Sequence, residues 1–234
     1  MNLKTTILIL FSANISILVP GQEAIITESD THIFWQPNNK LTQEDFLGKA
    51  SLDNQQIRLC DSAGVCTMAC TGLFAVLDIP KRKSDRRHLF EKAYFAPAFD
   101  KINSYSLLRN DSIGVYKQQI VFDLVEVVAR MARKELISIQ DSIKGIGAVA
   151  LFFKSVEARA NKNLDKFIDA YTFSVFILKE EGAWEKWRTQ VDEFLDTTNE
   201  YATTPEDCYR FVKNEPLSKK YIMAPLVVDN LYNE

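Results

Sequence analysis

Apolar and polar residues follow two different patterns along the chain. Up to about residue 112, short apolar runs rich in β-branched and aromatic residues are bounded by turn residues, which predicts strands. These runs are 24–27, 32–35, 71–79 and 90–99, the last interrupted by Pro97. From Ile113 to Tyr201, Gly and Pro are scarce and apolar residues recur every three or four positions, which predicts helices.

The first long helix should extend from Ile113 to Leu136, with Ser112 as its N-cap. Glu126 and Arg130 are four residues apart on this helix and form an attractive pair. Its apolar stripe is Ile120, Leu124, Val127, Val128 and Met131, and its polar face is Asp123, Glu126, Arg130 and Lys134. Further helices are expected over 149–160, 164–181, 183–197 and 203–212, and a single helical turn over 42–47.

These elements predict an α+β fold: a small, largely antiparallel N-terminal sheet packed on the long helix, followed by a C-terminal helical part. A length of 234 residues suits one domain, or one domain with an appendage. The hydrophobic fraction of 47%, with 15 Phe, is enough for a sizeable core, which excludes a wholly disordered chain. We divide the chain into an N-terminal signal segment, 1–21, an α+β domain, 22–140, and a helical C-terminal part, 141–234.

Residues 1–21 are typical of an export signal. Lys4 supplies the positive charge, an apolar segment runs from Ile7 to Val19, and Val19 and Gly21 fit a cleavage site before Gln22. The apolar segment is shorter than the roughly 20 residues of a membrane span, although an uncleaved anchor is an alternative. No Cys precedes Cys60, which excludes a lipid-modified Cys near the cleavage point. We therefore expect an exported protein, periplasmic or secreted, without an integral membrane span.

Export would remove one Lys and no acidic residue, leaving 27 basic and 31 acidic side chains and a net charge of −4. This mildly acidic balance does not indicate nucleic-acid or anionic-membrane binding. The expected partner is an envelope protein or an anionic ligand, with no nucleic acid. No cofactor is expected.

Four cysteines occur in the chain: Cys60, Cys66, Cys70 and Cys208. The first three form a Cys-x5-Cys-x3-Cys cluster, whose spacing misses the usual paired patterns of zinc sites. Because export favours oxidation, one or two disulfides are expected. Free buried thiols and a metal knuckle are the alternatives, and the sequence cannot choose among the three full pairings.

The strongest local charge is a basic run consisting of Lys81, Arg82, Lys83, Arg86 and Arg87. It is a possible anion-binding loop, although such a run is more often a solvated hairpin loop. His32 beside a strand is expected to be structural, and Trp184 and Trp187 should pack between helices. No phosphate-binding loop or Ser/His/Asp arrangement is recognisable.

Several segments, taken in order, resemble a family of exported bacterial proteins catalogued as domain of unknown function 922, often described as zinc-dependent proteases. They are Trp35 followed by Leu41-Thr-Gln-Glu-Asp-Phe-Leu-Gly48, then Ala93-Tyr-Phe-Ala-Pro-Ala-Phe99 with Ser104-Tyr105, then Leu107-Leu108, then Phe122-Asp-Leu-Val-Glu126 with Ala129-Arg130. The resemblance covers about residues 33–137. It implies a zincin-like core, in which the long helix carries a His-Glu-x-x-His zinc site.

The resemblance puts that zinc site on Lys117, Gln118 and Val121. None of these side chains suits the chemistry, because a protonated amine and an isopropyl group offer no lone pair and an amide is a very poor base. No metal is therefore expected. Val121 instead extends an apolar line with Val125, Val128 and Ala132. Alternatively, the helix never carried a metal, which predicts the same absence of zinc.

We therefore expect an exported, non-catalytic, pseudoprotease-like protein with a binding or scaffold role in the cell envelope. One alternative is a hydrolase that uses residues not recognised in the sequence. The other is a purely structural envelope component.

The export signal makes a direct prediction. Native mature protein should begin near Gln22 and lie outside the cytoplasm, since cleavage follows Gly21. N-terminal sequencing of material purified from its native source checks this, and a sequence starting at Met1 or Asn2 would contradict it.

Overall fold

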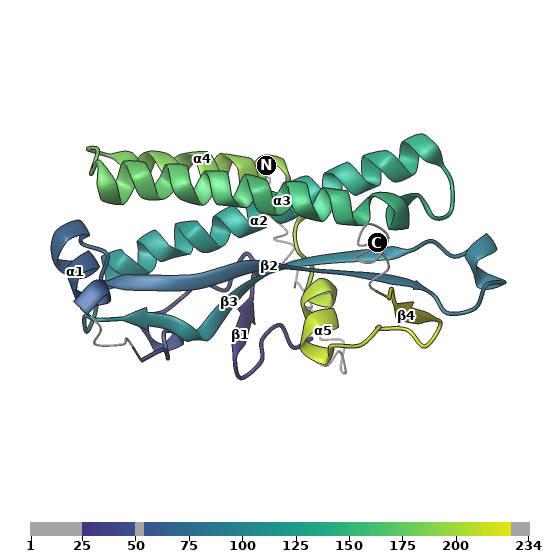
Figure 1. Cartoon of the computed structure of the whole chain (residues 1–234), viewed down its shortest axis with the longest axis horizontal. Coiled ribbons are helices and arrows are strands. Elements are labelled where there is room, and N and C mark those ends of the chain that lie inside the picture. The colour runs from purple at the N-terminus through teal and green to yellow at the C-terminus, as the bar shows by residue number, and fades with distance from the viewer. Residues whose placement is uncertain (1–24, 50–53, 226–234) are drawn as a thin grey trace, which may run out of the picture.

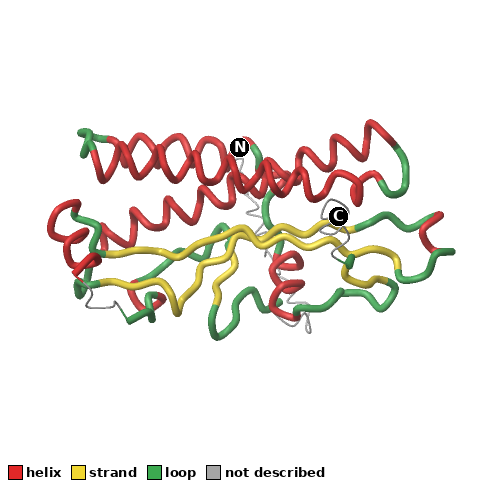
Figure 2. Tube along the Cα trace, viewed as in Figure 1, coloured by secondary structure: helices red, strands yellow, loops and turns green. Residues whose placement is uncertain are grey.

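A computed structural model describes residues 25–49 and 54–225 of the chain. Within them a four-stranded antiparallel sheet lies against a layer of long helices (Figures 1 and 2). The strands are β1 (His32–Phe34), β2 (Thr67–Pro80), β3 (Lys92–Ser106) and β4 (Tyr221–Met223). The helices are α1 (Asn54–Ala63), α2 (Ser112–Ile143), α3 (Ala148–Thr172), α4 (Ala183–Thr197) and α5 (Pro205–Lys213). The mixed α and β composition and the antiparallel sheet confirm the predicted fold class at this level.

The sheet is built on one long hairpin. Its strand order is β1-β3-β2-β4, and β2 pairs with β3 from Thr67↔Ser106 to Asp78↔Lys92. The prediction that Pro97 interrupts this strand is wrong, since β3 continues through it. Pro97 lies where the short strand β1 ends, and its carbonyl oxygen accepts from the Trp35 N–H at 3.0 Å. The missing N–H of Pro97 therefore costs little pairing.

Alternation along β3 separates two packing faces. Phe95 and Phe99 face α2, where Phe99 contacts the Phe122 ring. Ala96 and Ala98 face the other way and pack with Cys208 of α5. The sheet is thus covered by α2 and α3 on one side and by α5 on part of the other.

Helix α2 is the centre of the core. The predicted stripe residues Ile120, Leu124 and Val127 are buried against residues of α3 and α4, as expected. The opposite side is buried as well, because Phe122 and Ala129 pack toward the sheet. A helix covered on all sides has to find partners for each of its polar side chains inside the protein.

Several element boundaries differ from the predictions. The two helices expected over 149–160 and 164–181 form one helix, α3, followed by a π-helical turn, Phe173–Ile177. The predicted strand 24–27 makes no strand over its described residues, where Glu28 forms one bridge with Ile33. Helix α1 and strand β4 were not predicted. The three residues of β4 become a strand because they pair with β2, which a local pattern does not reveal.

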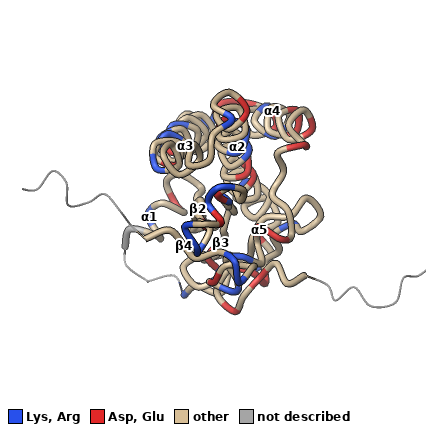
Figure 3. The backbone as a smooth tube through the Cα atoms, turned by 90° about the vertical axis from the view of Figure 1, so that its right-hand side faces the viewer, with Lys and Arg blue, Asp and Glu red and all other residues tan. Residues whose placement is uncertain are grey.

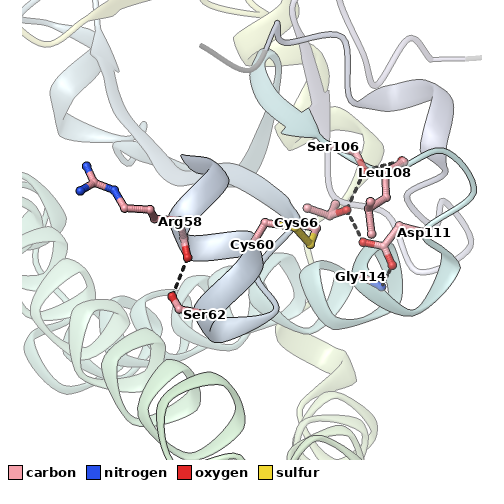
Figure 4. The surroundings of a disulfide bond; sticks show 9 residues. Arg58, Cys60, Ser62, Cys66, Ser106, Leu108, Asp111 and Gly114 are labelled. Atoms are coloured by element: carbon pink, nitrogen blue, oxygen red, sulfur yellow. Dashed lines mark hydrogen bonds between the residues drawn. A yellow bond between two sulfur atoms is a disulfide. The ribbon is translucent and has the colours of Figure 1, made fainter. Parts of the chain in front are cut away.

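The cysteines form one disulfide, between Cys60 at the end of α1 and Cys66 just before β2 (Figure 4). The disulfide prediction is therefore confirmed for this pair. Cys70 is an exposed free thiol and Cys208 a buried one. Burial raises the pKa of Cys208 to about 12, so this thiol stays protonated at physiological pH.

Next to the disulfide, β2 is joined to the start of α2. The Thr67 hydroxyl donates to Asp111 Oδ2 at 2.6 Å and lies 2.7 Å from the Ser106 hydroxyl. Asp111 in turn accepts from the Gly114 N–H at 2.9 Å (Figure 4). Asp111, and not the predicted Ser112, is therefore the N-cap of α2. A carboxylate suits this position because it satisfies a free N–H and complements the helix dipole.

A buried ion pair fixes α5 to the sheet. Arg210 donates to Asp78 through Nε at 2.7 Å and through Nη2 at 2.8 Å, and both side chains are almost fully buried. This bidentate geometry fixes the relative orientation of the two side chains as well as attracting them.

No helix among the described residues combines the length and apolarity needed to cross a bilayer.

Candidate functional site

Helix α2 carries a row of polar side chains at alternating spacings of four and three residues, all of them buried except the half-buried Arg133 at its end. The row consists of Gln119, Asp123, Glu126, Arg130 and Arg133. The sequence predicted a polar face here. The structure covers this face with the end of α4 and the segment 195–204. The expected Glu126–Arg130 pair is confirmed, with Arg130 Nε 2.7 Å from Glu126 Oε1.

Glu126 is bonded through both carboxylate oxygens. Oε1 accepts from the Thr203 N–H at 2.9 Å as well as from Arg130, and Oε2 accepts from the Thr203 hydroxyl at 2.5 Å. Burial raises the pKa of Glu126, while the Arg133 guanidinium and the Thr203 donors act against that rise. This carboxylate holds the C-terminal segment and leaves neither oxygen free of a protein donor.

Asp123, one turn earlier, is bonded in the same way. Oδ1 accepts from Trp35 Nε1 and from Gln119 Nε2, each at 2.7 Å. Oδ2 accepts from Arg188 Nη1 at 2.6 Å and lies 4.0 Å from Lys40 Nζ. One buried carboxylate therefore joins α4 and the segment after β1 to α2.

A cleft of about 660 Å³ lies beside this carboxylate, between the start of α2, the segment 40–43 and α4. Gln119 and Arg188 reach from its wall to Asp123, and Arg188 also binds Asp192 at 2.6 Å. The cleft is lined by Lys40, Leu41, Thr42, Gln43, Asn110, Ser112, Val115, Tyr116, Gln119, Arg188 and Asp192. No His or Cys is among these residues, and the Arg188 guanidinium is shared between two carboxylates. The cleft offers amides and hydroxyls for hydrogen bonding, and the Asp192 carboxylate in its lining is paired with Arg188.

A smaller hollow of about 460 Å³ lies between the start of β3, α2 and the start of α5. Tyr94 lines it, and burial together with the nearby Asp78 carboxylate raises its pKa to about 12. The Tyr94 phenol therefore stays protonated at neutral pH and does not act as a base.

The three positions at which the resemblance implies a zinc site, 117, 118 and 121, lie away from the 660 Å³ cleft. Lys117 is half-buried, and its Nζ lies 5.4 Å from the centre of the Phe176 ring. Gln118 is 5% exposed, and its Oε1 accepts from the Ala69 N–H at 3.0 Å. Val121 packs in the cluster that contains Tyr171 and Phe176. Each position therefore has a structural contact: with α3 and the turn after it, or with the edge of β2.

Residues from the distant segments of the resemblance meet at α2. Besides the Trp35–Asp123 bond, the Leu41 N–H donates to Gln119 Oε1 at 2.8 Å. Gly48 lies so close to β3 that a Cβ there would be 2.5 Å from the Ser104 carbonyl oxygen, which explains a residue without a side chain. These segments thus form one packed unit.

In the described ranges 25–49 and 54–225, no three His, Cys, Asp or Glu side chains are grouped so as to hold a metal ion. His32 is structural, as predicted. It lies 2.8 Å from the Thr31 hydroxyl and packs against the Phe34 and Phe74 rings. His88 is exposed in the basic loop. Trp187 is in the predicted helix packing and donates to the Ser174 hydroxyl at 3.0 Å.

The basic run Lys81–Arg87 lies in the exposed loop that joins β2 to β3. Its interpretation as a solvated hairpin loop is thus confirmed, and anion binding stays a prediction. The sequence pattern did not predict which residues lie beside this loop. The Lys81 N–H donates to the Lys220 carbonyl at 2.8 Å, which brings Lys219 and Lys220 beside the loop. Figure 3 looks onto this end, where Lys and Arg positions gather beside β2 and β4.

Comparison of the chain with models of protein families, with curated proteins and with solved structures found no match. The resemblance to domain of unknown function 922 therefore stays a prediction.

Arg188, Thr203 and Arg210 were not anticipated, although each contacts a buried carboxylate. One signal for them was present. Polar residues at spacings of four and three on a helix whose other sides are apolar indicate a polar seam inside the core, which requires charged partners elsewhere. The identity of those partners depends on tertiary packing.

The structural role of Gln118 is testable. Gln118→Ala should lower the free energy of unfolding by about 1–3 kcal/mol, because the Ala69 N–H loses its acceptor. Lys117→Ala, at the neighbouring half-buried position, breaks no side-chain hydrogen bond among the described residues; it is the control and should change stability far less. Urea unfolding followed by Trp fluorescence measures both. Equal stabilities of the two variants would contradict the role assigned to Gln118.

Proposed function

We propose that this protein is exported and non-catalytic, and that it binds an anionic partner in the cell envelope through its basic end. In this proposal α2 is a zincin-like helix whose metal positions now hold the fold together. The basic end is defined as the cations of the loop, Lys81, Arg82, Lys83, Arg86, Arg87 and Lys92, together with Lys219 and Lys220.

The absence of catalysis is supported by the state of the acidic residues on α2. Asp123 and Glu126 are fully buried, and each has four protein donors or cations as partners. A general base or a metal ligand needs a lone pair directed at its substrate or ion. Gln118, at the position where the resemblance implies the base, is an amide occupied by Ala69.

The observation that carries the binding role is the imbalance of charge at the basic end. Residues 81–92 contain six Lys or Arg and two acidic side chains, Asp85 and Glu91. No salt bridge within the described residues pairs a cation of this loop with a carboxylate. Elsewhere the buried Arg residues 130, 188 and 210 all have acidic partners. Like charges held together without counter-charges lower their energy by binding an anion.

The loss of metal chemistry can be measured directly. Purified protein dialysed briefly against zinc should retain no stoichiometric zinc by elemental analysis and should not cleave casein. The comparison variant is Lys117→His, Gln118→Glu, Val121→His, which restores the implied pair of imidazoles. Stoichiometric zinc in the natural protein, lost on changing Gln118, would refute the non-catalytic assignment.

Anion binding is tested with dextran sulfate as the probe. Lys81→Glu, Lys83→Glu, Arg87→Glu should weaken binding by more than about tenfold at moderate salt, because it reverses three charges at one place. Lys162→Glu, Lys166→Glu, Lys186→Glu makes the same net change on exposed positions of α3 and α4 and is the matched control. Equal weakening by both variants would show that only net charge matters and would contradict a local site.

A further inference from the structure

Exposed apolar side chains surround the basic end. Phe90 in the loop is 49% exposed and Met223 on β4 is 55% exposed. Ile143 and Ile146, in the turn between α2 and α3, are 51% and 39% exposed. Large apolar side chains gathered among cations at one end of a molecule mark an interaction site more often than single exposed ones do.

Contacts in the structure hold these groups at the same end of the molecule. Tyr221 of β4 donates through its hydroxyl to the Phe90 carbonyl at 3.1 Å, and the Lys92 ammonium lies over the Tyr221 ring. Glu91 accepts from the Gly147 N–H at 3.1 Å, which ties the turn between α2 and α3 to the base of the hairpin. Phe90, β4 and the helical turn thus form one surface, at the right-hand end of Figure 1.

We propose that this surface docks on an anionic lipid bilayer. The proposal rests on the anion-binding function above and names the class of partner. The cations would lie at the level of the phosphate headgroups, while Phe90, Met223 and the isoleucines of the helical turn would enter the boundary between headgroups and acyl chains. Combined basic and apolar contact is the pattern by which proteins lie on a membrane without crossing it.

The apolar residues distinguish this partner from a soluble polyanion. An acidic peptide or polysaccharide would neutralise the cations but would leave Phe90 and Met223 in water. A bilayer removes apolar surface from water at the same time as it neutralises charge.

The net charge of −4 expected for the mature chain does not oppose this docking. Membrane attraction falls off within a Debye length, about 8 Å at physiological ionic strength. Helix α4, which carries Glu185, Asp192 and Glu193, lies in the left-hand half of Figure 1, away from the basic end. The local excess of cations therefore sets the orientation, with the basic end toward the lipid.

The experiment is sedimentation of the mature protein with vesicles of phosphatidylcholine containing about one third phosphatidylglycerol, against vesicles of phosphatidylcholine alone. Binding is expected to the anionic vesicles and to weaken as salt is raised. Phe90→Ser, Met223→Ser should reduce vesicle binding at least several-fold and leave dextran sulfate binding unchanged. Ile177→Ser, Leu178→Ser removes two side chains of similar exposure, 58% and 52%, away from the basic end and should change neither.

The outcomes separate the two proposals. If Phe90→Ser, Met223→Ser binds vesicles like the natural protein, or if phosphatidylcholine alone binds equally well, the lipid inference is wrong. If dextran sulfate binds but anionic vesicles do not, the partner is a soluble polyanion and the anion-binding function stands. If neither probe binds, the anion-binding function itself is wrong. Because both apolar residues are exposed, thermal unfolding should show an intact fold in every variant.

Discussion

The fold depends on the burial of two carboxylates on one helix. Asp123 and Glu126 lie in the middle of α2, which is covered by the sheet on one side and by α3 and α4 on the other. A charge in such a place is costly unless donors surround it. Trp35, Gln119 and Arg188 satisfy Asp123, and Arg130 and Thr203 satisfy Glu126. These partners come from four separate segments, so the two carboxylates determine how those segments meet.

The same row of polar residues explains why we propose no catalytic role for Asp123 and Glu126. A catalytic acid must exchange partners during a reaction, whereas a structural acid must keep them. The bonds to Thr203 and Trp35 hold the C-terminal segment and the segment after β1 against the helix. On the other side of α2, Gln118 and Val121 provide a hydrogen bond and a packing contact to β2 and α3. The helix thus acts as a support on both of its sides, which fits the non-catalytic role that we propose.

Charge is divided between the interior and one end of the molecule. Inside, Arg130, Arg188 and Arg210 each have a carboxylate partner. At the basic end, the cations of the hairpin loop lie in solvent without such partners in the described residues, and Lys219 and Lys220 join them through the pairing of β4 with β2. A chain that is acidic overall can therefore present a strongly basic surface, and it is the surface, not the net charge, that a partner meets.

The sequence alone determined the local features of this protein. The three-to-four periodicity predicted α2 and α4, and the β-rich runs predicted the β2–β3 hairpin. The residue types at 117, 118 and 121 predicted no zinc ligands there. Each of these predictions depends on residue types a few positions apart. Only the tertiary structure decided that the polar face of α2 is buried, that Cys60 pairs with Cys66, and that Lys219 and Lys220 join the basic loop. Burial, disulfide pairing and charge clustering depend on distances between segments far apart in the chain, and a one-dimensional pattern does not contain those distances.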